Sequence, residues 1–219
     1  MHLILQNLNL VKSKVNKIIE IKQPKIKPKI IVVTKTFTLE KIKPLLENGH
    51  MHFGENKIQE AEAKWSDVKK NYGELKLHML GKLQTNKTKR AVKLFDYIHS
   101  LDSKKLAEKI SFYQRELNKK IKLFIQVNLG DEEQKTGISL NDLENFYTYC
   151  TKELGLNVVG LMCLPPINSD PKKYFLILKN YSKKLNLEDI SMGMSSDYEE
   201  AVLHGSTYLR LGRIILGER

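Results

Sequence analysis

Two patterns of apolar residues alternate along this chain. Short apolar runs, such as the one that opens "IIVVTKTFTLEKI" at residue 30, have the length of buried strands. Between them lie longer stretches in which apolar residues recur every three or four positions, as in amphipathic helices. The pattern predicts strands at 30–34, 51–54, 75–80, 97–101, 122–129, 157–164, 189–194 and 207–212. It predicts helices at 3–21, 39–47, 57–70, 87–94, 104–118, 141–154, 172–185 and 198–204.

The predicted strand–helix units follow one another without a change of composition. Such a succession predicts one α/β domain over residues 1–219, a single (β/α)8 TIM barrel, with a doubly wound parallel sheet as the alternative. Because 219 residues is near the lower limit for a barrel, we expect short insertions and no room for a second substrate domain.

A lysine directly follows the first predicted strand. Side chains alternate between the two faces of a strand, so Ile31, Val33 and Lys35 share one face, which we expect to point into the barrel. Burial there would lower the pKa of Lys35 and leave a nucleophilic amine, suited to a Schiff base with a carbonyl ligand. Taken alone, Lys35 is better explained as a lysine that reaches solvent from a strand end.

The last predicted strand carries an arginine at an inward position. Tyr208, Arg210 and Gly212 share one face, whereas Leu209 and Leu211 share the other and should pack against the surrounding helices. A guanidinium inside a barrel needs hydrogen-bond acceptors. Either an internal ion pair or the ring nitrogen or acid of a ligand would supply them.

The loops after the last two strands have the features of a phosphate site. The segment "MSSDYEEA" opens a helix with Ser195, Ser196 and Asp197, and hydroxyls and unpaired N–H groups at a helix start bind phosphate. Gly212 and the N–H of Arg213 would form the other half of the site, between the loops after strands seven and eight. Ordinary helix capping is the alternative. An amine, an inward arginine and a phosphate cradle on one rim together predict a pocket for pyridoxal 5′-phosphate (PLP).

Composition narrows the classes of function and the cellular location that remain. Lysine and arginine total 37 against 25 acidic residues, a formal net charge of +12, which keeps a basic nucleic-acid-binding protein as an alternative. The lysines are spread along the whole chain, however, without a basic stripe of interleaved aromatics. Two cysteines, Cys150 and Cys163, give neither a disulfide framework nor metal-ligand spacing, so we expect no metal. We find no signal peptide or membrane-length apolar run and expect a cytoplasmic protein with no membrane partner.

Seven stretches of the sequence resemble the pyridoxal phosphate homeostasis proteins. These proteins are single barrels similar to the N-terminal domain of alanine racemase, the fold-type III PLP barrel. In chain order over residues 31–219, the stretches are "VVTKTFTLEKI", "GHMHFGENKIQEAEAKW", "LHMLGKLQTNK", "FIQVNLGDEEQKTG", "GLMCLPP", "ISMGMSSDYEEAVLHGS" and "LRLGRIILGER".

The resemblance implies how PLP would be held. Lys35 would form the internal aldimine, and Arg210 would approach the pyridine nitrogen. Ser195, Gly212 and the backbone N–H of Arg213 would hold the phosphate. Many members of the family carry a threonine where this sequence has Arg213, so only the N–H of that residue is carried over. The charged guanidinium either compensates for the missing hydroxyl or points to solvent.

Three further residues would line the ring pocket by the same resemblance. They are Asn56, His78 and Met194. From the residues alone, His78 is more typical of a hydrogen-bonded core histidine. Asn56 is equally explained as a cap of the second helix.

The resemblance implies a carrier of PLP in vitamin B6 homeostasis rather than an enzyme. An incoming amine, including one on a PLP-dependent apoenzyme, would displace Lys35 by transimination. Lys135 in the loop "DEEQKTG" is a candidate second amine, although a solvated loop lysine is the commoner case. A small PLP-dependent racemase or decarboxylase is the alternative, but it would need an acid or base from a second domain. We expect a monomer, because no second subunit is needed to complete the site.

Overall fold

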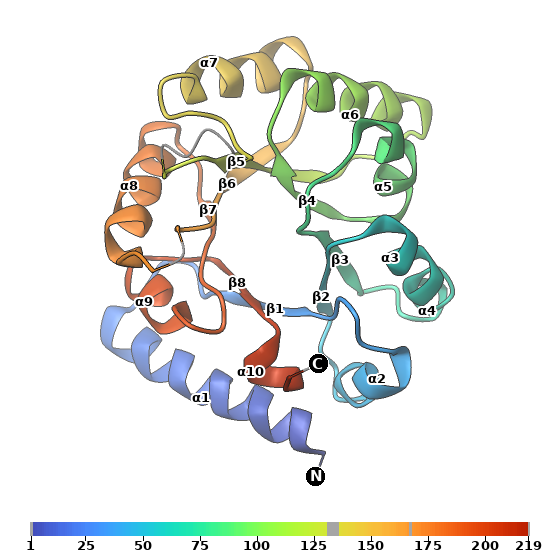
Figure 1. Ribbon diagram of the computed structural model, residues 1–219, viewed down its shortest axis with the longest axis vertical. Coiled ribbons are helices and arrows are strands. Elements are labelled where there is room, and N and C mark those ends of the chain that lie inside the picture. The colour runs from blue at the N-terminus through green and yellow to red at the C-terminus, as the bar shows by residue number, and fades with distance from the viewer. Residues whose placement is uncertain (1, 131–135, 167, 219) are drawn as a thin grey trace.

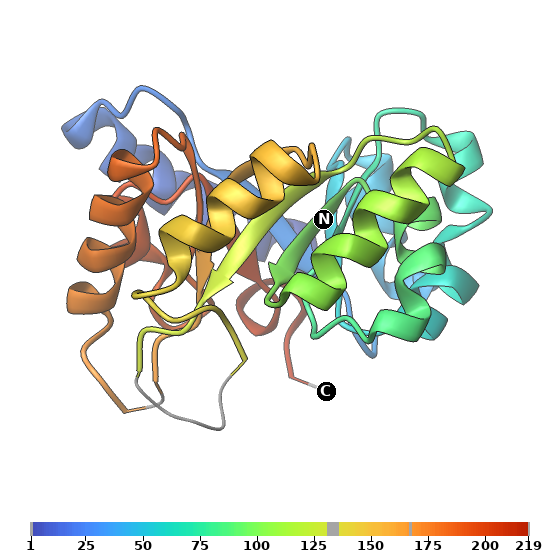
Figure 2. The same cartoon turned by 90° about the horizontal axis from the view of Figure 1, so that it is seen from above.

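The eight predicted strands close into a parallel barrel. The computed structural model describes residues 2–130, 136–166 and 168–218, and within them each strand pairs with the next while β8 pairs with β1. Figures 1 and 2 show the helices as an outer layer around this barrel. This topology confirms the TIM barrel over the doubly wound sheet. The strands are β1 (Lys29–Val33), β2 (His52–Glu55), β3 (Lys76–Met79), β4 (Tyr97–Leu101), β5 (Lys122–Val127), β6 (Val158–Cys163), β7 (Asp189–Ser191) and β8 (Tyr208–Leu211).

Most helices begin and end within a few residues of the predicted positions. They are α1 (Leu3–Lys22), α2 (Leu39–Glu47), α3 (Ile58–Trp65), α4 (Val68–Asn71), the short turn η1 (Thr85–Lys87), α5 (Thr88–Leu94), α6 (Lys104–Glu116), α7 (Leu143–Thr148), the wide turn η2 (Tyr149–Glu153), α8 (Pro171–Lys184), α9 (Tyr198–Leu203) and α10 (Arg213–Leu216). Helix α1 precedes the first strand and packs outside the ring against α9 and α10 (Figure 1). No helix within the described ranges is long and apolar enough to cross a membrane.

Side chains separate into two layers as the strand alternation predicts. Val32, Leu209 and Leu211 belong to the large apolar layer between strands and helices. The inward positions form a second, smaller cluster inside the barrel, made by Ile31, Tyr97, Phe124, Met162 and Tyr208. The predicted faces of the first and last strands are therefore confirmed, and the same alternation directs Arg210 inward.

The predicted helix 57–70 is divided into two. Helix α3 ends at Trp65 and α4 begins at Val68, with Ser66 and Asp67 between them. Short polar side chains of this kind compete for backbone hydrogen bonds and weaken a helix. Trp65 is fully buried and its Nε1 donates to Glu55 at 2.9 Å, whereas no residue of α4 is buried. Tertiary contact therefore stabilises the first half more than the second.

The C-terminal tail forms helix α10, although the sequence pattern predicts no helix there. The N–H groups of Ile215 and Leu216 both donate to the carbonyl of Gly212. Both side chains are buried in the layer to which α1 contributes. Because α10 is a single turn, it is too short to show a helical period in the sequence. Its contact with α1 decides its conformation.

Candidate functional site

A cavity of about 340 Å³ opens at the carboxyl ends of the barrel strands, the face where TIM barrels place their active sites. Its volume is in the range of small-molecule pockets. It contains all the residues predicted for the site except His78. The lining residues are Val33, Lys35, Phe37, Asn56, Leu80, Leu164, Met194, Ser195, Ser196, Arg210, Gly212 and Arg213.

Lys35 follows β1 and is half-buried in the wall of this cavity. The backbone on either side of it is tied down. The carbonyl of Thr34 accepts a hydrogen bond from Lys64 Nζ at 2.7 Å, and the N–H of Thr36 donates to the Glu60 carboxylate. Thr36 has a φ of 68°, which a β-branched residue adopts only under constraint. The turn therefore presents Lys35 from a fixed backbone. Lys135, the other candidate amine, lies outside the described residues.

Arg210 lines the same cavity from inside the barrel and is only 6% exposed. Its Nη1 donates to Ser191 Oγ at 2.7 Å, and its Nη2 donates to the carbonyl of Cys163 at 2.8 Å. Both partners are neutral, and no carboxylate of the described residues forms an ion pair with this guanidinium. Burial lowers the pKa of Arg210, which stays cationic at neutral pH because an arginine starts so far above it. Asp197 favours the charged form electrostatically from a distance, but no carboxylate of the described residues pairs with it directly, so the cavity has a buried positive charge without a close counterion.

The residues predicted for phosphate binding lie together after β7 and β8. Ser195 Oγ accepts a hydrogen bond from the Ile214 N–H at 3.4 Å, which links the loop after β7 to the start of α10. Gly212 is the residue immediately before α10, and Arg213 is its first residue. The side chain of Arg213 is exposed and forms no hydrogen bond or ion pair with the described residues. Hydroxyl, N–H and guanidinium groups therefore gather on one side of the cavity.

Two of the predicted capping roles are absent. Helix α9 has no side-chain cap, because Asp197 Oδ1 instead accepts from the Met194 N–H at 2.6 Å. Asn56 does not cap α3, whose N-cap residue is Lys57. Gly81 packs closely on Asn56, since a Cβ at Gly81 would lie 2.3 Å from the Asn56 carbonyl oxygen. Asn56 is therefore held at the cavity by the loop after β3.

His78 lies outside the cavity, in the interior of the barrel. It is fully buried, it stacks on Tyr97 with ring centroids 4.3 Å apart, and its ring nitrogens lie 3.0 Å from His52 and from His99. Burial lowers the pKa of His78 well below its ordinary value, so the ring is neutral. Leu80, two residues further along the same face of the chain, takes the place at the cavity. The structure therefore places His78 as a hydrogen-bonded core histidine, apart from the residues that line the cavity.

Metal and disulfide chemistry have no support in the described residues. Cys150 and Cys163 are free and buried, and burial raises the pKa of each thiol to about 12. Across residues 2–130, 136–166 and 168–218, no group of histidine, cysteine and acidic side chains could hold a metal ion.

Known proteins match this chain over nearly its whole length. Residues 6–219 match the family described as alanine racemase, N-terminal domain. A pyridoxal phosphate homeostasis protein of Synechocystis is 34% identical over 200 residues, which are 87% of this chain and 91% of that protein. The protein of that name from Aquifex aeolicus is also 34% identical, over 87% of each chain.

The chain belongs to the pyridoxal phosphate homeostasis protein family. PipY of Synechococcus elongatus has a similar structure both without PLP, with a TM-score of 0.87, and with PLP bound, with a TM-score of 0.86. Each comparison has 32% identity and covers at least 98% of this chain and all of PipY. An alanine racemase of Clostridium difficile is 14% identical and shares the fold alone, with a TM-score of 0.73 over 98% of this chain and 57% of that one.

The sequence did not predict three apolar side chains that line the cavity. Phe37, Leu80 and Leu164 all line the cavity. The alternation along β3 could have found Leu80, because it shares a face with His78. Ser191, the partner of Arg210, occupies an inward position of β7 that the same rule could have marked as a buried polar residue.

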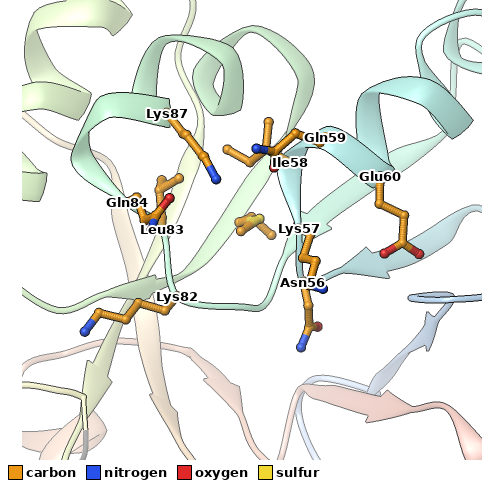
Figure 3. Close-up of a pocket in the computed structure, with 10 residues that line it drawn as sticks. Asn56, Lys57, Ile58, Gln59, Glu60, Lys82, Leu83, Gln84 and Lys87 are labelled. Atoms are coloured by element: carbon orange, nitrogen blue, oxygen red, sulfur yellow. The ribbon is translucent and has the colours of Figure 1, made fainter.

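A second cavity, of about 590 Å³, adjoins the first, and Asn56 lines both. Figure 3 shows its residues, which come from the segments after β2 and β3. Lys87 reaches into it, whereas Glu60 points away (Figure 3). Two of the stretches that resemble the family, "GHMHFGENKIQEAEAKW" and "LHMLGKLQTNK", therefore supply the residues that line this second cavity.

Proposed function

We propose that this chain binds PLP in the 340 Å³ cavity, as a Schiff base on Lys35, and holds it for intracellular PLP homeostasis. The observation that carries the proposal is a primary amine beside a buried guanidinium with only neutral partners, both lining one cavity. Relatives support it, since two of them are named pyridoxal phosphate homeostasis proteins and PipY has been solved with PLP bound.

The chemical groups in the cavity suit the groups of PLP. The amine of Lys35 would hold the aldehyde carbon, and the guanidinium of Arg210 would donate to the pyridine nitrogen. Ser195 and the backbone N–H groups at Gly212 and Arg213 would donate to the phosphate. Asn56 and Met194 would line the ring. In the proposed site His78 contacts no part of PLP, because it lies inside the barrel.

A carrier function follows from the charge of Arg210. Bound PLP supplies an electron sink, which depends on protonation of its ring nitrogen. A guanidinium that stays protonated donates to this nitrogen without giving up its proton, so the sink is weak. We therefore propose delivery of PLP to apoenzymes by an incoming amine that displaces Lys35. Steady turnover of an amino acid would favour the racemase or decarboxylase alternative, and steeply salt-dependent binding would favour the nucleic-acid alternative.

Replacing the amine of Lys35 tests the proposal directly. Purified protein mixed with PLP should gain a visible absorption band, and borohydride reduction should leave the adduct on the peptide that contains Lys35. In Lys35→Ala both should be lost, because Lys35 is the only lysine among the described residues that line the cavity. Lys82→Ala, which changes an exposed lysine of the neighbouring cavity, serves as the control and should keep both. Adducts spread over many surface lysines would contradict the proposal.

The side chain of Arg213 should add a small electrostatic contribution to PLP affinity. An exposed charge that pairs with a ligand phosphate contributes about 0.5–1 kcal/mol, so Arg213→Ala should raise the Kd of PLP about 2- to 5-fold. Added salt should reduce this difference. Lys25→Ala removes an equal charge from an exposed position outside the cavity and should leave the Kd unchanged. Equal Kd values for wild type and Arg213→Ala in low salt would mean that this guanidinium points to solvent.

A further inference from the structure

A continuous hydrogen-bonded chain of side chains runs from Arg210 through the interior of the barrel. Arg210 Nη1 donates to Ser191 Oγ, and Ser191 Oγ lies 2.8 Å from Nδ1 of His99. His99 Nε2 lies 3.0 Å from Nδ1 of His78, and His78 Nε2 lies 3.0 Å from Nδ1 of His52. The five residues come from β8, β7, β4, β3 and β2, and His52 begins β2 at the opposite end of the barrel.

The three histidine rings are neutral and held in place. Burial lowers the pKa of His78 and of His99 well below the ordinary value, and it lowers that of His52 to about 4. His99 stacks on Phe124 with centroids 4.2 Å apart, as His78 does on Tyr97. Each neutral ring has one donor nitrogen and one acceptor nitrogen. All hydrogen bonds of this side-chain network must therefore be donated in the same direction, either away from Arg210 or toward it, and we call this direction the polarity of the network.

Arg210 selects one of these polarities. A guanidinium can only donate, so Ser191 Oγ accepts from it. If Ser191 then donates to His99 Nδ1, every later link is satisfied, with the ring proton on Nε2 of all three histidines. In the reverse polarity, His99 also donates to Ser191, and the buried Ser191 hydroxyl hydrogen has no acceptor among the described residues. An unpaired buried donor disfavours that arrangement about 5- to 150-fold.

The selected polarity points the acceptor side of every group toward Arg210. Aligned hydroxyl and imidazole dipoles attract a cation, and they polarise one another along the chain. A carboxylate in the same place would neutralise the guanidinium. These dipoles stabilise it without a direct ion pair, so its charge stays available to a ligand.

We propose that Ser191, His99 and His78 are positioning residues, whose hydrogen-bonded chain fixes the Arg210 guanidinium in one orientation in the cavity and compensates its burial without neutralising it. None of the three touches the cavity, so they act on a ligand only through Arg210. The effect on PLP rests on the proposed function, whereas the polarity of the chain can be measured in the protein without PLP.

The first test is the tautomeric state of the histidines in wild-type protein. Long-range ¹H–¹⁵N NMR spectra at pH 7.5 should show His99, His78 and His52 with the proton on Nε2. The Arg210 guanidinium N–H signals should be resolved, because its rotation is restricted by Ser191 and Cys163. A proton on Nδ1 of His99, or an exchanging mixture, would overturn the proposal without any variant being made.

The second test compares two buried serines. Ser191→Ala removes the link to Arg210, whereas Ser206→Ala removes a buried hydroxyl that donates to the Met192 carbonyl and touches neither Arg210 nor the histidines. Ser191→Ala should broaden the Arg210 N–H signals and raise the Kd of PLP about tenfold relative to Ser206→Ala. Matched melting temperatures of the two variants would separate this effect from a general loss of stability.

Two results would overturn the proposal: sharp Arg210 signals in Ser191→Ala, or PLP affinities that are the same in both variants. If wild-type protein binds no PLP, the proposed function is wrong. The NMR results would still show whether the hydrogen-bonded side chains restrict the Arg210 guanidinium. If Ser191→Ala does not fold, the histidine tautomers of the wild-type protein alone test the proposal.

Discussion

Lowering the pH from 7 to 5 is expected to destabilise this protein by an amount comparable to its whole folding free energy. Three histidines are buried in the folded protein: His50, His78 and His99. Burial lowers the pKa of His50 to about 4 and holds those of His78 and His99 well below the ordinary value. In the unfolded chain each ring would titrate near 6.5. Unfolding below about pH 6.5 therefore takes up protons, so the free energy of unfolding falls as the pH falls.

The expected loss is about 2 kcal/mol for each buried ring between pH 7 and pH 5, or about 6 kcal/mol for the three. Typical domains have only about 5–15 kcal/mol of stability. Half-buried His52, whose pKa burial lowers to about 4, adds to the loss. Asp102 and Asp189 act in the opposite direction, because burial raises their pKa values and they gain protons on folding at acid pH. Urea unfolding curves at pH 7, 6 and 5, followed by circular dichroism, would measure the net slope.

Replacing one buried histidine measures the contribution of a single ring. His50→Gln removes one titrating ring while leaving a donor for the His52 carbonyl, so the pH dependence should become weaker by about a quarter to a third. A stability that is the same at pH 7 and pH 5 would show that the interior rings are hydrated in solution.

Removing the ammonium of Lys64 is expected to cost about 3–5 kcal/mol of stability. Lys64 is 7% exposed, and its Nζ lies 2.8 Å from Oε1 of Glu55, which is fully buried. The same carboxylate oxygen accepts from Thr34 at 2.7 Å and from Trp65 at 2.9 Å, while Glu55 Oε2 has no hydrogen-bond partner in the part of the chain that the structure describes. Lys64→Met would leave this buried carboxylate without its close cation and the Thr34 carbonyl without its donor. Urea unfolding at pH 7.5 would measure the loss.

A double-mutant cycle distinguishes an unpaired charge from lost packing. If the cost comes from the uncompensated carboxylate, Glu55→Gln combined with Lys64→Met should recover more than half of it. The exposed pair Lys70–Asp67 provides the control, because its side chains are 75% and 90% exposed. Lys70→Met should therefore change stability by less than about 0.5 kcal/mol. A loss of that small size for Lys64→Met would contradict the structure of the buried pair.

The Glu55–Lys64 pair also concerns function, because it fixes the strand end that carries Lys35. Lys64 holds the Thr34 carbonyl, and Glu60 holds the Thr36 N–H, on either side of Lys35. Loosening this turn should broaden the range of Lys35 positions and weaken PLP binding as well as stability.

The alternating pattern of the sequence determined the barrel and the inward faces of its first and last strands. Strand periodicity is local, since successive side chains must point to opposite faces of a strand. It was enough to predict that Lys35 and Arg210 lie at the same end of the barrel interior. The loops after strands seven and eight were placed by the same topology, so Ser195, Gly212 and Arg213 also meet where they were predicted to meet.

Only the tertiary structure decided what the inward polar residues contact. His78 was predicted at the pocket, but its depth in the barrel is set by the stagger of neighbouring strands, which a single sequence does not encode locally. The hydrogen-bonded side chains from Arg210 to His52 come from five strands, and no short-range sequence pattern links their positions. Helix α10 and the division between α3 and α4 depend in the same way on burial against distant elements. Local periodicity thus determined which side chains face inward, while long-range packing decided which of them reach the pocket and which support it from within.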